Sequence, residues 1–509
     1  MLTSALIIAT LIFAVNAAIG PVTDLHIVNK VIAPDGFSRS TVISGATPDT
    51  ASTPGPLVIG KKGDQFRINV INSLHDRSML TTTSIHWHGI YQGGSSWADG
   101  PVGVTQCPIT PGNSFLYEFT VPDQAGTFWY HSHHSTQYCD GLRGPLVVYD
   151  DDDPHKSLYD VDDESTVITL SEWYHPPSPS QGLIPVYDSI LVNGVGRYIG
   201  GPASPLAIVN VSQGTRYRIR LLSLSCDPHF SFSIDNHIMT VIEVDGVSTQ
   251  PLTVDSIDIF AGQRYSFILN ANQAVGNYWI RAVPVPPPIG LAILRYAGAP
   301  NAEPRTLETP SVRPLIETDL VPLQNSPAPG APYLGGADIN LVLNITTNVT
   351  TGQYYINGAS FTPPTVPVLL QILSGARRAQ ELLPSGSVYV LPRNKVVEVS
   401  IPGGSDQSPH PFHLHGQNFA VIRSANSPAL DFAHPVIRDV VNTGVIGDNV
   451  TFRFTTDNPG PWFLHCHIDW HLQLGLAIVF VTDSDATAES RRPAAWDQLC
   501  PIYNQSGLP

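Results

Sequence analysis

Ten of the 18 histidines lie in four short clusters, and each cluster contains a His-x-His pair. The clusters are His86-Trp87-His88, His131-Ser132-His133, His410-Pro411-Phe412-His413-Leu414-His415 and His465-Cys466-His467-Ile468-Asp469-Trp470-His471. On a strand, residues i and i+2 project from the same face, so each pair could bind one site. A core histidine costs desolvation energy unless it is paired, so ten clustered histidines favour metal binding over core packing.

The ligand types indicate which metal is bound. Ten imidazoles, one thiol flanked by histidines and no carboxylate-rich cluster argue against Mg²⁺ and Ca²⁺, which prefer oxygen ligands. A Cys₂His₂ zinc site would need a second cysteine. Two histidines and one cysteine are typical of a blue-copper site, which predicts a mononuclear copper held by His410, Cys466 and His471.

Eight histidines remain for a second metal group, and they can hold about three coppers. They are His86, His88, His131, His133, His413, His415, His465 and His467. If the His465-Cys466-His467 segment is extended, both histidines face one way and Cys466 faces the other. One residue's backbone then links two metal groups, which suits electron transfer. Three coppers at a dioxygen site and one remote copper supply the four electrons that reduce O₂ to two waters.

The elements that carry these clusters are predicted to be short strands. Charged residues make up 13% of the chain, against about 25% in a typical soluble protein, and 46 of the 509 residues are proline. This composition disfavours long solvated helices and favours strands joined by turns. Three stretches of strand-like alternation predict an all-β chain of antiparallel sandwiches or barrels. The expected domains are residues 18–151, 152–320 and 321–509.

The first and third of these domains share a sequence phrase. Phe128-Trp129-Tyr130-His131-Ser132-His133 in the first domain is echoed by Trp462-Phe463-Leu464-His465-Cys466-His467 in the third. The echo predicts related domains, with the metal chemistry in the first and the last.

The N-terminus predicts export from the cell. Residues 2–15 are almost entirely apolar, and Val15-Asn16-Ala17 fits a signal-peptidase site, so residues 1–17 are the expected signal peptide. No later segment has 18 consecutive apolar residues, so no membrane span is expected. A net charge of −16 argues against a nucleic-acid partner. Five sequons are compatible with glycosylation, at Asn210, Asn344, Asn348, Asn449 and Asn504.

Five cysteines in an oxidising compartment leave one outside any disulfide. Cys466 lies between two histidines and is the best candidate for a thiolate ligand. The other four should pair, and three connectivities are open. These four are Cys107, Cys139, Cys226 and Cys500.

Taken together, the motifs resemble those of fungal (basidiomycete-type) laccases in the multicopper oxidase family. Beside the four clusters, the resemblance rests on Trp97-Ala98-Asp99-Gly100-Pro101, Gly141-Leu142-Arg143-Gly144-Pro145, Leu224-Ser225-Cys226-Asp227-Pro228 and Asn458-Pro459-Gly460-Pro461-Trp462-Phe463. It implies three cupredoxin-like Greek-key domains in tandem, with a trinuclear copper cluster between the first and third. The implied activity is that of a laccase (benzenediol:oxygen oxidoreductase). Such an enzyme oxidises phenolic compounds by one electron and reduces O₂ to water, and its roles include lignin degradation.

The resemblance also assigns roles to individual residues. It implies four coppers in a monomer and disulfides that join Cys107 to Cys500 and Cys139 to Cys226. His86 and His413 correspond to the type 2 copper ligands. The type 3 pair corresponds to His88, His131, His133, His415, His465 and His467. His134, which follows one of these pairs, is expected to lie outside the copper sites.

Four further positions complete the expected site. Leu476, ten residues after Cys466, stands where the family places an axial residue, and the absence of a thioether there predicts an intermediate-to-high reduction potential. Asp188 matches a pocket carboxylate and would take the phenolic proton while the electron enters at His471. Asp99 resembles a carboxylate near the type 2 copper and would supply protons. Asp469 either supplies protons or orients a histidine.

Three other functions use the same residues. A ferroxidase would need carboxylates around the entry histidines. Ascorbate-specific relatives usually carry the axial methionine that this chain lacks. A non-catalytic copper-binding protein should have lost some ligands, whereas all eleven are present. These comparisons favour a laccase.

Overall fold

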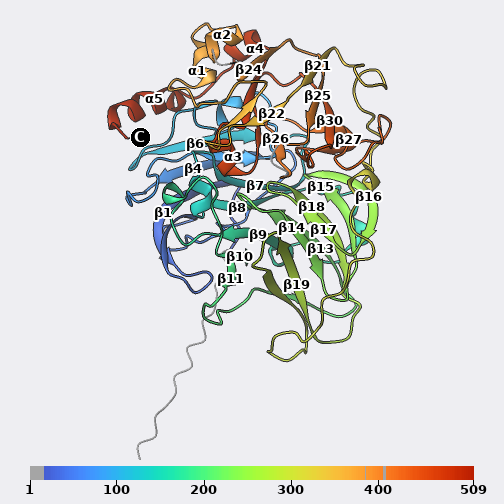
Figure 1. Ribbon diagram of the computed structural model, residues 1–509. Helices are drawn as coiled ribbons and strands as arrows, with labels where there is room; N and C mark the ends of the chain where they lie inside the picture. Colours follow the sequence, from blue (N-terminus) through green and yellow to red (C-terminus); the bar gives the residue numbers. More distant parts are fainter. Residues whose placement is uncertain (1–16, 384–385, 405–407, 509) are drawn as a thin grey trace, which may run out of the picture.

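The computed structural model describes residues 17–383, 386–404 and 408–508, which form mainly strands (Figure 1). Apart from Ala17, the predicted signal peptide lies outside the described residues. In the described part of the chain, no helix is both long and apolar enough to cross a membrane.

The strands of the first domain form two four-stranded sheets. One has the order β2-β1-β4-β6 and the other has the order β3-β8-β7-β5. The first sheet consists of β1 (Val22–Ile32), β2 (Arg39–Gly45), β4 (Gln65–Asn72) and β6 (Ser114–Thr120). The second consists of β3 (Val58–Lys61), β5 (Ile85–His88), β7 (Gly126–Ser132) and β8 (Arg143–Tyr149).

The second domain, green in Figure 1, also has two sheets, with the orders β11-β10-β9-β13-β18-β15-β16 and β12-β20-β19-β14-β17. The larger sheet contains β9 (Val167–Trp173), β10 (Ser189–Val192), β11 (Val195–Tyr198), β13 (Arg216–Ser223), β15 (Met239–Val244), β16 (Val247–Val254) and β18 (Arg264–Asn270). The smaller one contains β12 (Ile208–Val211), β14 (Phe230–Ile234), β17 (Ile257–Ile259), β19 (Asn277–Pro284) and β20 (Gly290–Tyr296).

The third domain repeats the two-sheet plan and adds a hairpin and short helices. Its sheets have the orders β21-β25-β30-β27-β28 and β24-β32-β31-β26-β29. The first comprises β21 (Ile339–Val342), β25 (Val396–Pro402), β27 (Phe419–Arg423), β28 (Val436–Arg438) and β30 (Asn449–Thr455). The second comprises β24 (Val388–Leu391), β26 (Pro411–Leu414), β29 (Val440–Asn442), β31 (Gly460–Cys466) and β32 (Ala477–Thr482). The other elements are β22 (Ile345–Thr347), β23 (Tyr354–Ile356), α1 (Val368–Leu373), α2 (Ala379–Leu382), α3 (Asp469–Gln473), α4 (Ser484–Ala488) and α5 (Ala494–Ser506).

The strands form sandwiches because their side chains alternate between core and solvent. In β19, every second residue is buried, whereas the histidine-bearing strands β7 and β31 are buried on both faces. Each of the six main sheets contains one parallel strand pair. The prediction of an all-β chain is confirmed, while the domain limits at 151 and 320 stay predictions.

Two disulfides tie the domains together. Cys107 of the first domain is bonded to Cys500 in α5, which places the C-terminal helix beside the blue and cyan strands of the first domain (Figure 1). Cys139 is bonded to Cys226, which joins the first domain to the second. Of the three open connectivities, the structure has the one that the family resemblance implies.

Candidate metal centre

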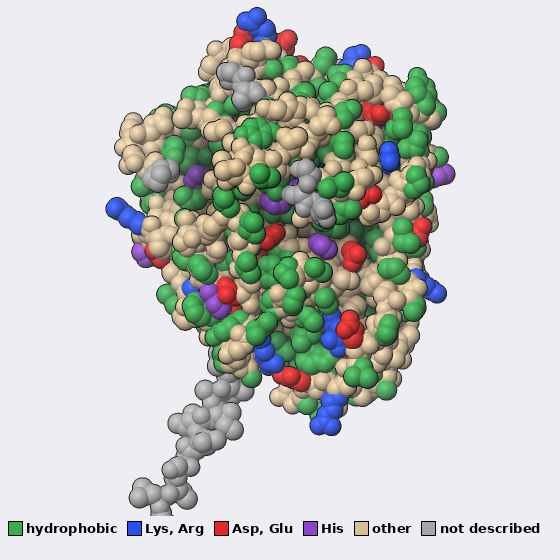
Figure 2. Space-filling view, viewed as in Figure 1, with side chains coloured by type: hydrophobic (Ala, Val, Ile, Leu, Met, Phe, Trp, Pro, Cys, Tyr) green, Lys and Arg blue, Asp and Glu red, His purple; other side chains and the backbone are tan. Residues whose placement is uncertain are grey.

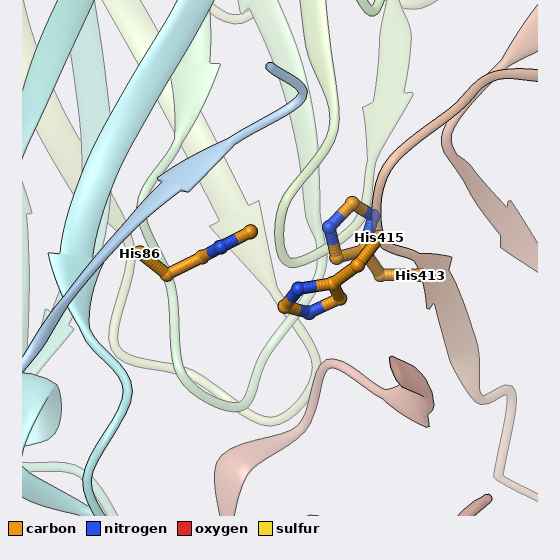
Figure 3. A group of neighbouring side chains, drawn as sticks. All are labelled: His86, His413 and His415. Carbon is orange, nitrogen blue, oxygen red and sulfur yellow. The ribbon is translucent and has the colours of Figure 1, made fainter. Parts of the chain in front are cut away.

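Two strands from the first domain and two from the third deliver the histidine clusters to one place. In the first domain, β5 and β7 pair so that His86 lies directly opposite His131. In the third, β26 and β31 pair so that His413 lies opposite His465. Figure 3 shows His86, from the blue strand, and the His413 and His415 rings, from the third domain, converging on one space.

Eight buried imidazoles surround this space. Ligand nitrogens lie within 4.8 Å of one another in three groups, which are His86–His413–His415, His86–His88–His131 and His133–His415–His465. His467 joins them through Nε2, which lies 3.2 Å from His88 Nδ1. His131 and His133 fall in different groups, whereas His86 and His88 share one group and His413 and His415 share another.

Most of these rings are held from behind by one nitrogen. The Nδ1 atoms of His86, His131, His413 and His465 donate to the backbone carbonyls of Asp99, Ser132, Asp439 and Cys466 over 2.8–2.9 Å. His415 Nδ1 donates to Asp99 Oδ2 over 2.9 Å. These bonds fix the tautomer and aim each Nε2 at the shared space.

The inward nitrogens are those that a metal would satisfy. In the described chain, Nε2 of His86, His131 and His413 is buried and has no hydrogen-bond partner. Burial lowers the pKa of His131 and His413 well below the ordinary value, and it lowers the pKa of His465 to about 3. Neutral imidazoles keep a lone pair for a metal ion, so this donor set fits a metal cluster.

A second, smaller group lies on the other side of β31. Cys466 Sγ lies 3.6 Å from Nδ1 of His410 and 3.6 Å from Nδ1 of His471, and these two nitrogens are 3.1 Å apart. Two imidazoles and one thiolate in a triangle are the donor set of a blue-copper site. Cys466 follows His465 directly and faces the opposite way, so one peptide unit separates the two groups.

The outer face of this smaller group is formed by α3. His471 lies in α3 and is partly exposed, whereas His410 and Cys466 are buried. Leu476 is buried, and its backbone is hydrogen-bonded to two residues of the smaller group. Its N–H donates to the His471 carbonyl, and its carbonyl accepts from Cys466 N–H. A cleft of about 560 Å³ borders α3 at Trp470, Gln473 and Leu474.

The two candidate carboxylates for the entry site, those of Asp188 and Asp227, have different hydrogen-bond partners. The Asp188 carboxylate accepts from His175 N–H over 2.7 Å and lies 3.6 Å from the His175 ring. Asp227 instead accepts from the Tyr174 hydroxyl over 3.5 Å, and this hydroxyl accepts from Trp470 Nε1 over 3.0 Å.

Trp470 precedes the candidate ligand His471 in α3, so these contacts connect Asp227 to the smaller group. Asp227 has no role among the expectations from the sequence, although it directly follows Cys226 in a motif that carries the family resemblance. Its acidic side chain beside a cysteine near the ligands was the available signal.

The remaining predicted residues have clear positions. Asp99 is fully buried, its Oδ1 lies 3.2 Å from His86 Nδ1, and burial raises the pKa of its carboxyl. Asp469 is buried beside the Cys139–Cys226 disulfide, and burial together with Glu172 raises its pKa well above the usual range. His134 lies in none of the ligand groups of the described residues, and its Nε2 is 2.8 Å from the Thr82 hydroxyl.

Comparisons with known proteins agree with this geometry. Three multicopper oxidase family models match residues 41–153, 164–299 and 361–486. The chain is 61% identical to Laccase-2 of Pleurotus ostreatus, with 99% of this chain and 98% of that protein covered. It is 58% identical to Laccase-2 of Trametes villosa, with 96% and 95% covered.

Solved structures show the same architecture. The laccase from Botrytis aclada superposes with a TM-score of 0.81 at 31% identity, covering 97% of this chain and 93% of that one. Fet3p, a multicopper oxidase that functions in iron import, superposes with a TM-score of 0.83 at 26% identity, covering 96% and 95%. The cupredoxin-like fold with three domains is thereby confirmed. The chain belongs to the multicopper oxidase family, and it is a four-copper laccase that couples the oxidation of phenolic substrates to the reduction of O₂.

Proposed function

We propose that eleven residues hold the four coppers of this laccase. His410, Cys466 and His471 would hold the type 1 copper, and His86 and His413 the type 2 copper. The type 3 pair would be held by His88, His131, His133, His415, His465 and His467. The observation that supports this proposal most strongly is that buried Nε2 atoms of His86, His131 and His413 lie in one cluster of eight imidazoles and have no hydrogen-bond partner among the described residues. When bound, the coppers supply one-electron acceptance at one site and four-electron reduction of O₂ at the other.

A thiolate variant tests the proposed split into two groups. Cys466→Ser should lower the copper content from four to three per chain and remove the blue colour, because a hydroxyl is a far weaker copper ligand than a thiolate. The type 2 electron paramagnetic resonance (EPR) signal should persist, since its ligands are on other residues. Copper loss spread evenly over both groups would contradict the assignment.

The reducing substrate is proposed to approach the partly exposed ring of His471. The electron would then pass from the smaller group to the larger one through Cys466 and the backbone that joins it to His465 and His467. A second cleft, of about 610 Å³, lies between the first and third domains and is lined by Tyr91 and Gly416, which closely follow ligand pairs. This cleft is the proposed entrance for O₂.

A carboxylate near His471 is proposed to accept the phenolic proton as the electron leaves. Asp188 is the residue that the sequence suggested, whereas the contacts through Tyr174 and Trp470 favour Asp227. Burial and the neighbouring Glu172 raise the pKa of Asp227 to about 7, which suits a base that works near neutral pH.

The two carboxylates can be separated by matched variants. Asp227→Asn should lower kcat/KM for a methoxyphenol while leaving a non-phenolic dye unaffected, because only the phenol loses a proton. Asp188→Asn is the control, and it should leave kcat/KM nearly unchanged for both the methoxyphenol and the dye. If the phenol-specific loss follows Asp188 instead, the assignment by contacts is wrong. Equal losses with both reductants would reject a proton-accepting role.

Asp99 is proposed to serve the larger group. Its carboxylate accepts from His415 of the third domain, and its backbone carbonyl accepts from His86 of the first. It therefore orients ligands from two domains and lies where protons for O₂ reduction are needed.

Export and surface modification complete the proposal. The chain is proposed to be secreted as a monomer after removal of residues 1–17. Four of its five sequon asparagines are exposed, namely Asn210, Asn344, Asn348 and Asn504, whereas Asn449 in β30 is partly buried. Mass spectrometry of the secreted protein would test this proposal, which expects Ala18 as the N-terminus and glycans on the exposed sites.

A further inference from the structure

His88 is oriented differently from the rings around it. The rings whose Nδ1 is bonded to the backbone present Nε2 to the shared space. His88 instead presents Nδ1, which lies 3.2 Å from His467 Nε2. Its Nε2 instead points outward and donates to Asp439 Oδ1 over 3.3 Å. The carbonyl of the same Asp439 accepts from His413 Nδ1 over 2.9 Å. Asp439 therefore holds one candidate ligand from the first domain and one from the third.

Asp439 is in turn held by a residue of the second domain. Arg264, the first residue of β18, donates from Nη1 and Nη2 to the two Asp439 oxygens over 2.6 and 2.8 Å. Its Nε donates to the Thr127 carbonyl of the first domain over 3.0 Å. Both Arg264 and Asp439 are fully buried. A planar guanidinium with donors in a fixed fork sets the carboxylate orientation in a way that a single ammonium group does not.

The turn before Arg264 also packs against the ligands. A Cβ added to Gly262, which has a φ of +84°, would lie 2.9 Å from His467 Cδ2 and 3.0 Å from His88 Cε1. The next residue, Gln263, donates from Nε2 to the Val440 carbonyl of the third domain over 3.1 Å. Residues 262–264 therefore contact both ligand-bearing domains at the metal centre.

We propose that the Gly262–Arg264 turn is a positioning element for the trinuclear centre, and that Arg264 acts through Asp439 to keep His88 in its reversed orientation. The second domain contributes no residue to the ligand groups of the described chain, so its part in the chemistry would be to fix the ligands of the other two. This inference rests on the proposed ligand role of His88. Partners of this kind change metal affinity or activity by about 10–100-fold when they are lost.

The test uses the full-length copper-loaded protein and the variants Arg264→Met and Arg264→Lys. The matched control is Arg281→Met, which removes another second-domain arginine with a bidentate aspartate partner, Asp235, at 2.8 and 2.9 Å. After dialysis against a chelator, copper per chain, the type 2 EPR signal and the blue absorbance are measured. Thermal unfolding of the copper-free proteins reports on folding independently.

Both Arg264 variants should lose trinuclear copper, with affinity reduced about 10–100-fold, while the blue absorbance stays. Arg281→Met should keep all four coppers. If Arg264→Met does not fold, Arg264→Lys decides the question, because it keeps the charge and loses the fork. Full retention of trinuclear copper, or parallel loss of both copper types with a lowered unfolding temperature, would overturn the inference.

His88→Ala serves as the reference for the ligand assignment. It should lose trinuclear copper selectively in the same dialysis. If it does not, the proposed ligand set fails. If His88→Ala loses copper and the Arg264 variants do not, only the positioning role fails.

Discussion

The second domain has the strand plan of the first and third, yet it carries none of their candidate ligands. β7, β19 and β31 occupy the same place in their sheets, next to the strand of the parallel pair. Each begins at or just after a glycine, namely Gly126, Gly276 and Gly460. Counted from that glycine, Arg281 of β19 stands where β7 has His131 and β31 has His465.

The neighbouring strands show the same correspondence. Ser233 of β14 lies opposite Arg281, as His86 lies opposite His131. Two residues further along the chain, Asp235 stands where the first domain has His88. Arg281 and Asp235 are bonded to each other in two places. One fold thus holds an ion pair in one copy and candidate metal ligands in the others, so different side chains at shared backbone positions give the domains different chemistry.

The largest effect is expected when a first-domain histidine is replaced by arginine, the residue at the equivalent position of the second domain. His131→Arg should remove the trinuclear copper signals and reduce phenol-dependent O₂ uptake more than about 100-fold, beyond the effect of losing an outer partner. The reason is that a guanidinium has no lone pair for copper and places a charge among buried imidazoles. Copper analysis and oxygen uptake check this outcome, and His131→Ala controls for the size of the new side chain.

A smaller effect is expected where one carboxylate serves both ligand-bearing domains. Asp99→Ala removes the acceptor of His415 Nδ1 but keeps the carbonyl that holds His86. Copper affinity at the trinuclear centre or turnover should fall about 10–100-fold. Chelator titration and steady-state kinetics measure this loss. An unchanged variant would show that backbone contacts alone orient the rings.

The entry site should show a more modest, pH-dependent effect. Because burial raises the pKa of Asp227 to about 7, its carboxyl is protonated in acid and accepts a proton only as the pH rises through that value. The ratio of phenol to non-phenolic dye oxidation should therefore increase up to about pH 7 and become flat in Asp227→Asn. A raised acid pKa also destabilises the fold as pH rises above the unfolded value, so Asp227→Asn should unfold no earlier than the parent protein at pH 7.

The mildest change concerns the type 1 potential alone. Leu476→Met should lower that potential, because a thioether beside Cys466 stabilises the oxidised copper, while the trinuclear signals stay as they were. Leu391→Met in β24, another buried leucine of the third domain, is the matched control. Redox titration of the blue band measures both variants, and an equal potential in all three proteins would reject the axial role of Leu476.

The candidate ligands could be found from the sequence, and the structure brings them together, because their signal is local. A His-x-His pair on a strand and a cysteine between two histidines are visible within seven residues, and an antiparallel register then places such pairs opposite each other. The contacts of Arg264 were not predictable, since they depend on how three domains dock. Asp188 and Asp227 differ in the same way, because each is a carboxylate in a recognisable motif and only tertiary contacts distinguish them.

The candidate ligands of the larger group are divided evenly between two domains, with four histidines on β5 and β7 and the segment after β7, and four around β26 and β31. The four histidines of one domain cannot supply all the ligands of the cluster. Copper binding and the docking of the first and third domains are therefore thermodynamically coupled. By thermodynamic linkage, copper that binds only the docked arrangement adds its binding free energy to the cohesion of the molecule. Removing copper with a chelator would then weaken the contact between the first and third domains in particular.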